Sequence, residues 1–272
     1  MPSSPARSVV VGISEGRESE VALDWAVNEA RLRGRSLHIV ATDSWSETMP
    51  TGAHAQGPAL PSLSPEVNQT FHRALERARN HLEGDSVTGE LMPGRPIRAL
   101  RNAAATAGVL VVGAREGEHR HSVSHAVAAH AACPVVVVRG ESRPKPHKRI
   151  VVGVDGSKEA HHAMTFAFDE AELRGATLEA IQCADTAGSD RADDVQQQLT
   201  ESVAPYRQKH PDLAIDENVL NGRPVDELTL HSDDADLIVV GSRGRGRVLG
   251  ALLGSVSQQL IEHAHCPVVV VK

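Results

Sequence analysis

Aromatic side chains are almost missing from this sequence. Phenylalanine, tryptophan and tyrosine make up 2% of the 272 residues, whereas hydrophobic residues as a whole make up 40%. Large rings therefore cannot fill the interior, and we expect a core built from Val, Leu, Ile and Ala.

The sequence also lacks an excess of positive charge, long apolar segments and paired cysteines. There are 28 basic and 35 acidic residues, and a net charge of -7 argues against a general partner among nucleic acids or anionic membranes. No stretch approaches the roughly 18 consecutive apolar residues of a membrane-spanning helix. Cys133, Cys183 and Cys266 are odd in number and form no Cys-x-x-Cys motif. We expect a cytoplasmic protein in which each thiol is a small buried apolar group.

The chain contains one pattern twice. Residues 8–37 align without gaps on residues 149–178, "GRPIRAL" matches "GRPVDEL", and "CPVVVVR" matches "CPVVVVK". A repeat of this length predicts two copies of one domain, which we place at residues 1–140 and 147–272. The stretch between them is polar and carries two prolines, as is typical of an extended linker.

Each half alternates strand and helix patterns. Continuous β-branched runs such as "SVVVGI" and "RIVVGV" are typical of strands covered on both faces. Amphipathic helices follow these runs and end at Gly34 and Gly175, where a C-cap belongs. The second helices are expected over residues 66–83 and 194–209. This order predicts an α/β fold of two tandem, doubly wound, mostly parallel five-stranded sheets with helices on both faces, in a Rossmann-like arrangement.

In open α/β sheets, ligands bind beyond the carboxyl ends of the strands. After the first strand of the second half, "VGVDGS" places Asp155 where its carboxylate can accept hydrogen bonds from a sugar hydroxyl or a base amine. The alternative is that Asp155 or Ser157 only caps the next helix.

A basic glycine-rich loop follows the strongest strand of the same half. In "VVGSRGRGRVLGALLGSVSQQL", Gly241, Gly244 and Gly254 precede a helix that opens with Ser255. Glycines let backbone N–H groups approach phosphate oxygens, and the start of a helix is an anion site. The alternative is a flexible loop in which Ser255 only caps the helix.

The spacing Gly241-x2-Gly244-x9-Gly254-Ser255 resembles the ATP-binding signature of the universal stress protein family, as do "VVGVDGS", "GRP" and "CPVVVV". The resemblance covers both halves and implies an adenine-nucleotide alpha-hydrolase-like fold that binds ATP, with or without Mg2+. It implies that Val154 and Asp155 face the nucleoside and that Cys183 lines the adenine pocket. Its remaining contacts would be made by residues that border the ribose and the phosphates: Val240, Gly241, Arg243, Gly244, Gly254, Ser255, Val256 and Ser257.

The first half departs from this signature. Ser14 stands in place of Asp155, Glu116 in place of Gly244, and His121 in place of Gly254, and the loop is shorter. We expect this half to keep the fold without binding ATP in the family's manner. Four histidines gather in it, at positions 119, 121, 125 and 130, but no carboxylate or cysteine stands at matched spacing, and we predict no metal site.

The resemblance also implies that the two "CPVVVV" strands pair, so that the halves form an intramolecular pseudo-dimer. The sequence leaves open whether two whole chains form a homodimer. No Walker A, Gly-x-Ser-x-Gly or His-Glu-x-x-His motif is present. The leading hypothesis is a regulatory or protective ATP-binding protein of the stress response that is no enzyme or at most a weak ATPase. The alternatives are a slow ATPase or nucleotidyl-transferring enzyme using Asp155, and a scaffold that binds no nucleotide.

Overall fold

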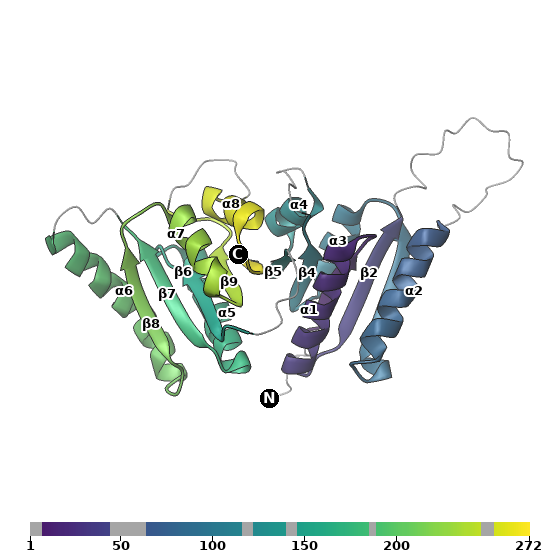
Figure 1. Ribbon diagram of the computed structural model, residues 1–272, viewed down its shortest axis with the longest axis horizontal. Coiled ribbons are helices and arrows are strands. Elements are labelled where there is room, and N and C mark those ends of the chain that lie inside the picture. The colour runs from purple at the N-terminus through teal and green to yellow at the C-terminus, as the bar shows by residue number, and fades with distance from the viewer. Residues whose placement is uncertain (1–6, 44–63, 116–121, 140–145, 185–188, 246–252) are drawn as a thin grey trace, which may run out of the picture.

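The computed structural model describes residues 7–43, 64–115, 122–139, 146–184, 189–245 and 253–272. Its two halves follow the same order of strands and helices and stand side by side (Figure 1). The first half contains β1 (Val9–Ile13), α1 (Arg17–Arg33), β2 (Leu37–Asp43), α2 (Pro65–Arg79), β3 (Val87–Pro93), α3 (Pro96–Ala104), β4 (Val109–Gly113), α4 (Val123–His130) and β5 (Val135–Val138). The second contains β6 (Arg149–Gly153), α5 (Lys158–Arg174), β7 (Thr177–Cys183), α6 (Ser189–Lys209), β8 (Ile215–Leu220), α7 (Pro224–His231), β9 (Leu237–Gly241), α8 (Ser255–His263) and β10 (Val268–Val271). The order predicted from the repeat is confirmed.

The strands form one sheet in the order β3-β2-β1-β4-β5-β10-β9-β6-β7-β8. Pairing is parallel within each half, as in β1 beside β2 and β6 beside β9. The two halves meet through the antiparallel pair β5 and β10, in which Val136 lies opposite Val269. The predicted pairing of the valine strands is therefore confirmed, and it joins the two five-stranded sheets into a sheet of ten. Each half thus covers what would otherwise be an exposed apolar edge of the other.

Helices cover both faces of this sheet. Alternate strand residues point to opposite faces, so Val9 and Val11 contribute to one core and Val10 to the other. The first core packs under α1, α2, α5 and α6, and the second under α3, α4, α7 and α8. Aliphatic residues and alanine fill both, as the scarcity of aromatics requires. None of the helices in the described ranges is long and apolar enough to cross a membrane.

The boundaries of several elements follow from local chemistry. Gly34 and Gly175 end α1 and α5 with φ of 59° and 58°, the left-handed conformation that favours glycine, which confirms the predicted C-caps. Helix α2 ends at Arg79, earlier than expected, and α6 begins at Ser189, earlier than expected. Periodicity alone fixes helix ends poorly, because the first and last turns depend on caps and neighbours.

Four charged residues link α1 of the first half to α5 of the second. Arg33 contacts the carboxylates of Glu29 and Glu170, and Arg174 contacts the same two carboxylates, with its Nε 2.7 Å from Glu170 Oε2. Both glutamate side chains are fully buried. The repeat aligns Glu29 with Glu170 and Arg33 with Arg174, so this four-residue ion cluster repeats one pattern across the pseudo-twofold axis.

The ion cluster predicts a pH dependence of stability. Burial and the nearby Glu170 carboxylate raise the pKa of Glu29 to about 7 from its usual 4.5, whereas the two arginines hold the pKa of Glu170 below its usual value. A raised folded-state pKa gives stability that is complete below about pH 4.5 and lost as the pH rises through 7. One proton corresponds to a slope of about 1.4 kcal/mol per pH unit between these limits.

The Glu29→Gln variant should remove this part of the slope, because an amide does not titrate. Urea unfolding of the wild type and the variant at intervals from pH 5 to pH 8 measures the difference. Parallel stability curves for the two proteins would contradict the assignment to Glu29.

Candidate functional site

The carboxyl ends of β9, β6 and β7 lie next to one another in the second half. The predicted residues Val154 and Asp155 follow β6, while Val240 and Gly241 close β9. The loops after these two strands touch: an added Cβ on Gly244 would collide with Asp155 Oδ2. The structure therefore brings the aspartate of the first loop to the glycines of the second.

Asp155 ties these two loops together. Its Oδ1 accepts the backbone N–H of Ser157 at 2.9 Å, and its Oδ2 accepts the backbone N–H of Arg245 at 2.9 Å. The cap of α5 is Ser157, whose hydroxyl accepts the N–H of Ala160 at 3.1 Å. Of the two residues considered for capping, Ser157 is the N-cap, and Asp155 bridges the loops.

Gly241 and Arg243 have close counterparts in the first half. An added Cβ on Gly241 would come within 2.9 Å of the carbonyl carbon of Glu159 at the start of α5, so the glycine lets the helix pack closely on β9. Arg243 lies 3.5 Å from the Glu159 carboxylate. Gly113 is packed against Glu18 in the same way, and Arg115 pairs with Glu18 at 2.5 Å. These two features support packing in both halves and do not by themselves distinguish a binding half.

The start of α8 does distinguish the second half. Its N-cap is Gly254, which offers no side chain, so the alternative in which Ser255 only caps this helix is wrong. Gly254 is held in place because its N–H donates to Ser242 O at 2.7 Å. The N–H groups of Ser255, Val256 and Ser257 form the first turn, where a helix supplies no internal acceptor. This turn carries the positive end of the helix dipole with no hydroxyl cap of its own.

The two serines of that turn are placed differently. Ser255 is exposed. Ser257 is buried, and its hydroxyl donates to Gly254 O at 2.9 Å and approaches Ser242 O at 3.3 Å. Ser257 therefore supports the loop through its side chain, and what it can offer a ligand is its backbone N–H.

The equivalent helix of the first half is closed by its own side chain. Ser122 caps α4, its Oγ accepting the N–H of His125 at 3.4 Å. The same Oγ lies 2.9 Å from His125 Nδ1 and 2.7 Å from Ser124 Oγ. The substitutions at Glu116 and His121 lie outside the described residues, as does His119. The first turn of α4 is thus already occupied by a hydroxyl cap.

Cys183 ends β7 and is half-buried, whereas the other two cysteines are buried, and all three are free thiols. Burial, together with the negative charge of Glu227 on α7, raises the pKa of the Cys183 thiol to about 11. Glu227 was not singled out from the sequence. A comparison of the aligned motifs "GRPVDEL" and "GRPIRAL" could have found it, because Glu227 of the second half aligns with Ala99 of the first.

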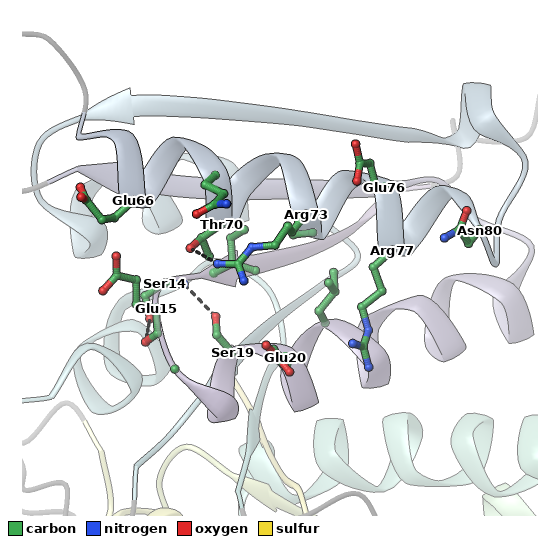
Figure 2. Close-up of a pocket in the computed structure, with 15 residues that line it drawn as sticks. Ser14, Glu15, Ser19, Glu20, Glu66, Thr70, Arg73, Glu76, Arg77 and Asn80 are labelled. Carbon is green, nitrogen blue, oxygen red and sulfur yellow. Dashed lines mark hydrogen bonds between the residues drawn. The ribbon is translucent and has the colours of Figure 1, made fainter.

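A cavity of about 610 Å³ opens in the first half, between α1 and α2. It lies beside Ser14, the counterpart of Asp155, and is lined by charges of both signs (Figure 2). Arg77 is engaged by Asp24 at 2.6 and 2.7 Å, and Arg73 bonds Thr70 at 3.2 Å. The cavity is lined by Gly16, the N-cap of α1, and by no residue of the loop after β4, so it differs in place from the loops after β6 and β9 of the second half.

The histidines of the first half are not gathered into a ligand set where they are described. His125 is buried, with Nε2 3.4 Å from Glu262 Oε1 of α8, and His130 Nδ1 lies 2.8 Å from Ala126 O within α4. In the described residues, no three His, Cys, Asp or Glu side chains are grouped as metal ligands.

Comparison with known proteins agrees with the repeat and the fold. The model of the universal stress protein family matches residues 5–139 and again 146–272. Universal stress protein Rv2623 of Mycobacterium tuberculosis is 30% identical over 97% of this chain and 96% of its own, and universal stress protein Rv2005c of the same organism is 32% identical over the same shares. The crystal structure of a universal stress protein from Archaeoglobus fulgidus covers 99% of both chains with a TM-score of 0.73 at 18% identity, which shows the shared fold. The chain therefore belongs to the universal stress protein family and carries two copies of its domain in tandem.

Proposed function

We propose that the second half binds ATP, with or without Mg2+, and that the chain acts as a nucleotide-dependent regulator in the stress response. The observation that carries this proposal is the first turn of α8 behind Gly254, which has no side-chain cap and lies next to the glycine loop that Asp155 holds. Three adjacent backbone N–H groups at the positive end of a helix favour a phosphate group. The backbone of Arg243 lies next to Gly254, and the Arg245 guanidinium lies against Gly156 in the loop after β6. The three free thiols fit the reducing cytoplasm in which we place the protein.

Binding is favoured over turnover by the state of Asp155. Both of its carboxylate oxygens already accept backbone N–H groups of the two loops, which is a positioning role. A general base must instead direct a free oxygen at the proton it removes. Turnover of excess ATP far above the rate of an Asp155→Ala variant would favour an enzyme instead.

The first half serves in this proposal as a structural twin of the binding half. Its helix α4 is capped by Ser122, and Ser14 replaces the bridging aspartate. A phosphate entering there would have to displace a hydroxyl from the N–H groups it needs.

The proposal predicts one nucleotide per chain. Calorimetric titration of the purified full chain, first freed of nucleotide by mild unfolding and refolding, should give a stoichiometry near one, because α8 has no side-chain cap whereas its counterpart α4 is capped by Ser122. Two sites of similar affinity would contradict the role assigned to the first half, and no binding at all would leave the chain a scaffold.

A further inference from the structure

The order of the strands fixes the direction in which a bound nucleotide would extend. Phosphates at the start of α8 lie beyond β9, and on one side of β9 stands β10, which is paired with β5 of the other half. On the other side lie β6, with Asp155 at its end, and then β7, with Cys183 at its end. Neighbouring strands are about 4.8 Å apart, so β7 lies roughly 10 Å from β9, which suits the reach of a nucleoside from its phosphates. The base is therefore expected over the ends of β6 and β7.

Apolar side chains pack between α7 and the ends of β6 and β9. Leu228 of α7 and Val240 of β9 both pack on Gly153, where an added Cβ would meet them at 3.2 and 3.3 Å. Val154, Leu228 and Val240 are all buried. These side chains are engaged in the core, so discrimination between bases at this end depends on the few polar groups near it.

Glu227 supplies a polar group at this edge. It precedes Leu228 on α7, and its carboxylate lies against Gly222, on the loop after β8. Its charge acts on the thiol of Cys183 at the end of β7. Within the described part of the chain, the Glu227 side chain has no hydrogen bond or ion pair, whereas the neighbouring Asp226 lies 3.6 Å from Arg223.

The first half lacks this group. The repeat aligns Glu227 with Ala99 and Leu228 with Leu100, so the apolar contact is kept and the carboxylate is lost. Leu100 packs on Gly12 as Leu228 packs on Gly153. The carboxylate is therefore not needed to build this fold, since the first half forms the same helix and the same leucine contact without it.

We infer that Glu227 determines the base specificity of the second half by accepting a hydrogen bond from the 6-amino group of adenine. This inference rests on the proposed nucleotide site. A carboxylate accepts from an amine but repels the 6-carbonyl oxygen of guanine or hypoxanthine. A hydrogen bond to a charged acceptor is among the stronger ones, so loss of the carboxylate should weaken binding of the aminated base about tenfold or more.

The test compares ATP with purine riboside triphosphate, which lacks only the 6-amino group, in calorimetric titrations of the full chain. The wild type should bind ATP about tenfold more tightly than purine riboside triphosphate. In Glu227→Ala this ratio should fall to about one through loss of ATP affinity alone, while Glu227→Gln, which keeps an acceptor oxygen, should retain part of it. Asp226→Asn is the matched control, because it removes a neighbouring charge on the same helix turn, and its ratio should equal that of the wild type.

Each other result overturns the inference. An unchanged ratio in Glu227→Ala would remove Glu227 from base recognition and leave the nucleotide site standing. Equal weakening of both nucleotides would show a structural role. Tighter binding of GTP than of ATP by the wild type would show that the carboxylate reads a different base. A wild type that binds no nucleotide would overturn the proposed function as well.

Discussion

The Gly254→Asp variant is expected to lose nucleotide binding while keeping a fold at least as stable as that of the wild type. Gly254 has φ of −70° and ψ of 158°, which any residue can adopt and which suits an N-cap. Among the residues that the structure describes, an added Cβ there would meet nothing closer than 3.4 Å, the Cα of Arg243, which is ordinary contact. An aspartate would cap α8 with its own carboxylate, as Ser122 caps α4 with its hydroxyl.

That cap would place a negative charge on the N–H groups that a phosphate needs. We expect affinity for ATP to fall by about a hundredfold or more, since donors are lost and like charges meet. The helix itself should gain a few tenths of a kcal/mol from the cap. Isothermal titration and thermal unfolding of the same preparation measure the two effects separately, so a loss of binding cannot be confused with unfolding.

Two further variants complete this experiment. Gly254→Ala adds a methyl group without a charge or a cap and should bind with intermediate affinity. Ser122→Ala removes the cap of α4 in the first half and should cost about 1 kcal/mol of stability without changing the nucleotide titration. Wild-type affinity in Gly254→Asp would mean that the phosphates bind elsewhere.

The Glu170→Ala variant is expected to destabilise the chain by about 3–5 kcal/mol. Its carboxylate, fully buried between α1 and α5, contacts both Arg33 and Arg174. Removing it leaves two guanidinium groups close together with one carboxylate, that of Glu29, between them. Breaking a buried pair by removing one partner costs more than the pair itself contributes, because the remaining charge stays desolvated.

Equilibrium unfolding in urea measures this loss, and the two halves should also unfold less cooperatively. The matched control is Glu172→Ala on the same helix, whose carboxylate is 66% exposed and pairs with His210. That exposed pair should contribute at most about 1 kcal/mol. Equal effects of the two substitutions would show that the ion cluster does not hold the halves together.

Much of the fold could be predicted from the sequence, because the repeat shows most strand and helix patterns twice. Each strand and helix pattern occurs twice, so the α/β order and the C-cap glycines at positions 34 and 175 could be predicted and are confirmed. The pairing of the valine strands is implied by the resemblance to the family, and it is confirmed as well. The glycine spacing and its loss in the first half are also sequence facts. They identify the second half as the candidate for anion binding. An anion site needs backbone N–H groups that approach the ligand closely, and glycine allows that approach.

Other features required the folded chain. Whether a serine or a glycine caps a helix depends on where the helix begins. Ser255 and Ser122 are aligned, but Ser255 is the first residue of α8 whereas Ser122 is the N-cap that precedes α4. The bridging role of Asp155, the packing role of Gly241 and the effect of the Glu227 charge on Cys183 each depend on residues far apart in the chain. The sequence by itself determined the repeat, the alternation of elements and the candidate loops, because these arise from local periodicity and residue type. Only the tertiary structure decided which backbone donors are left open and which carboxylates are buried together, because hydrogen bonding and desolvation depend on what packs alongside.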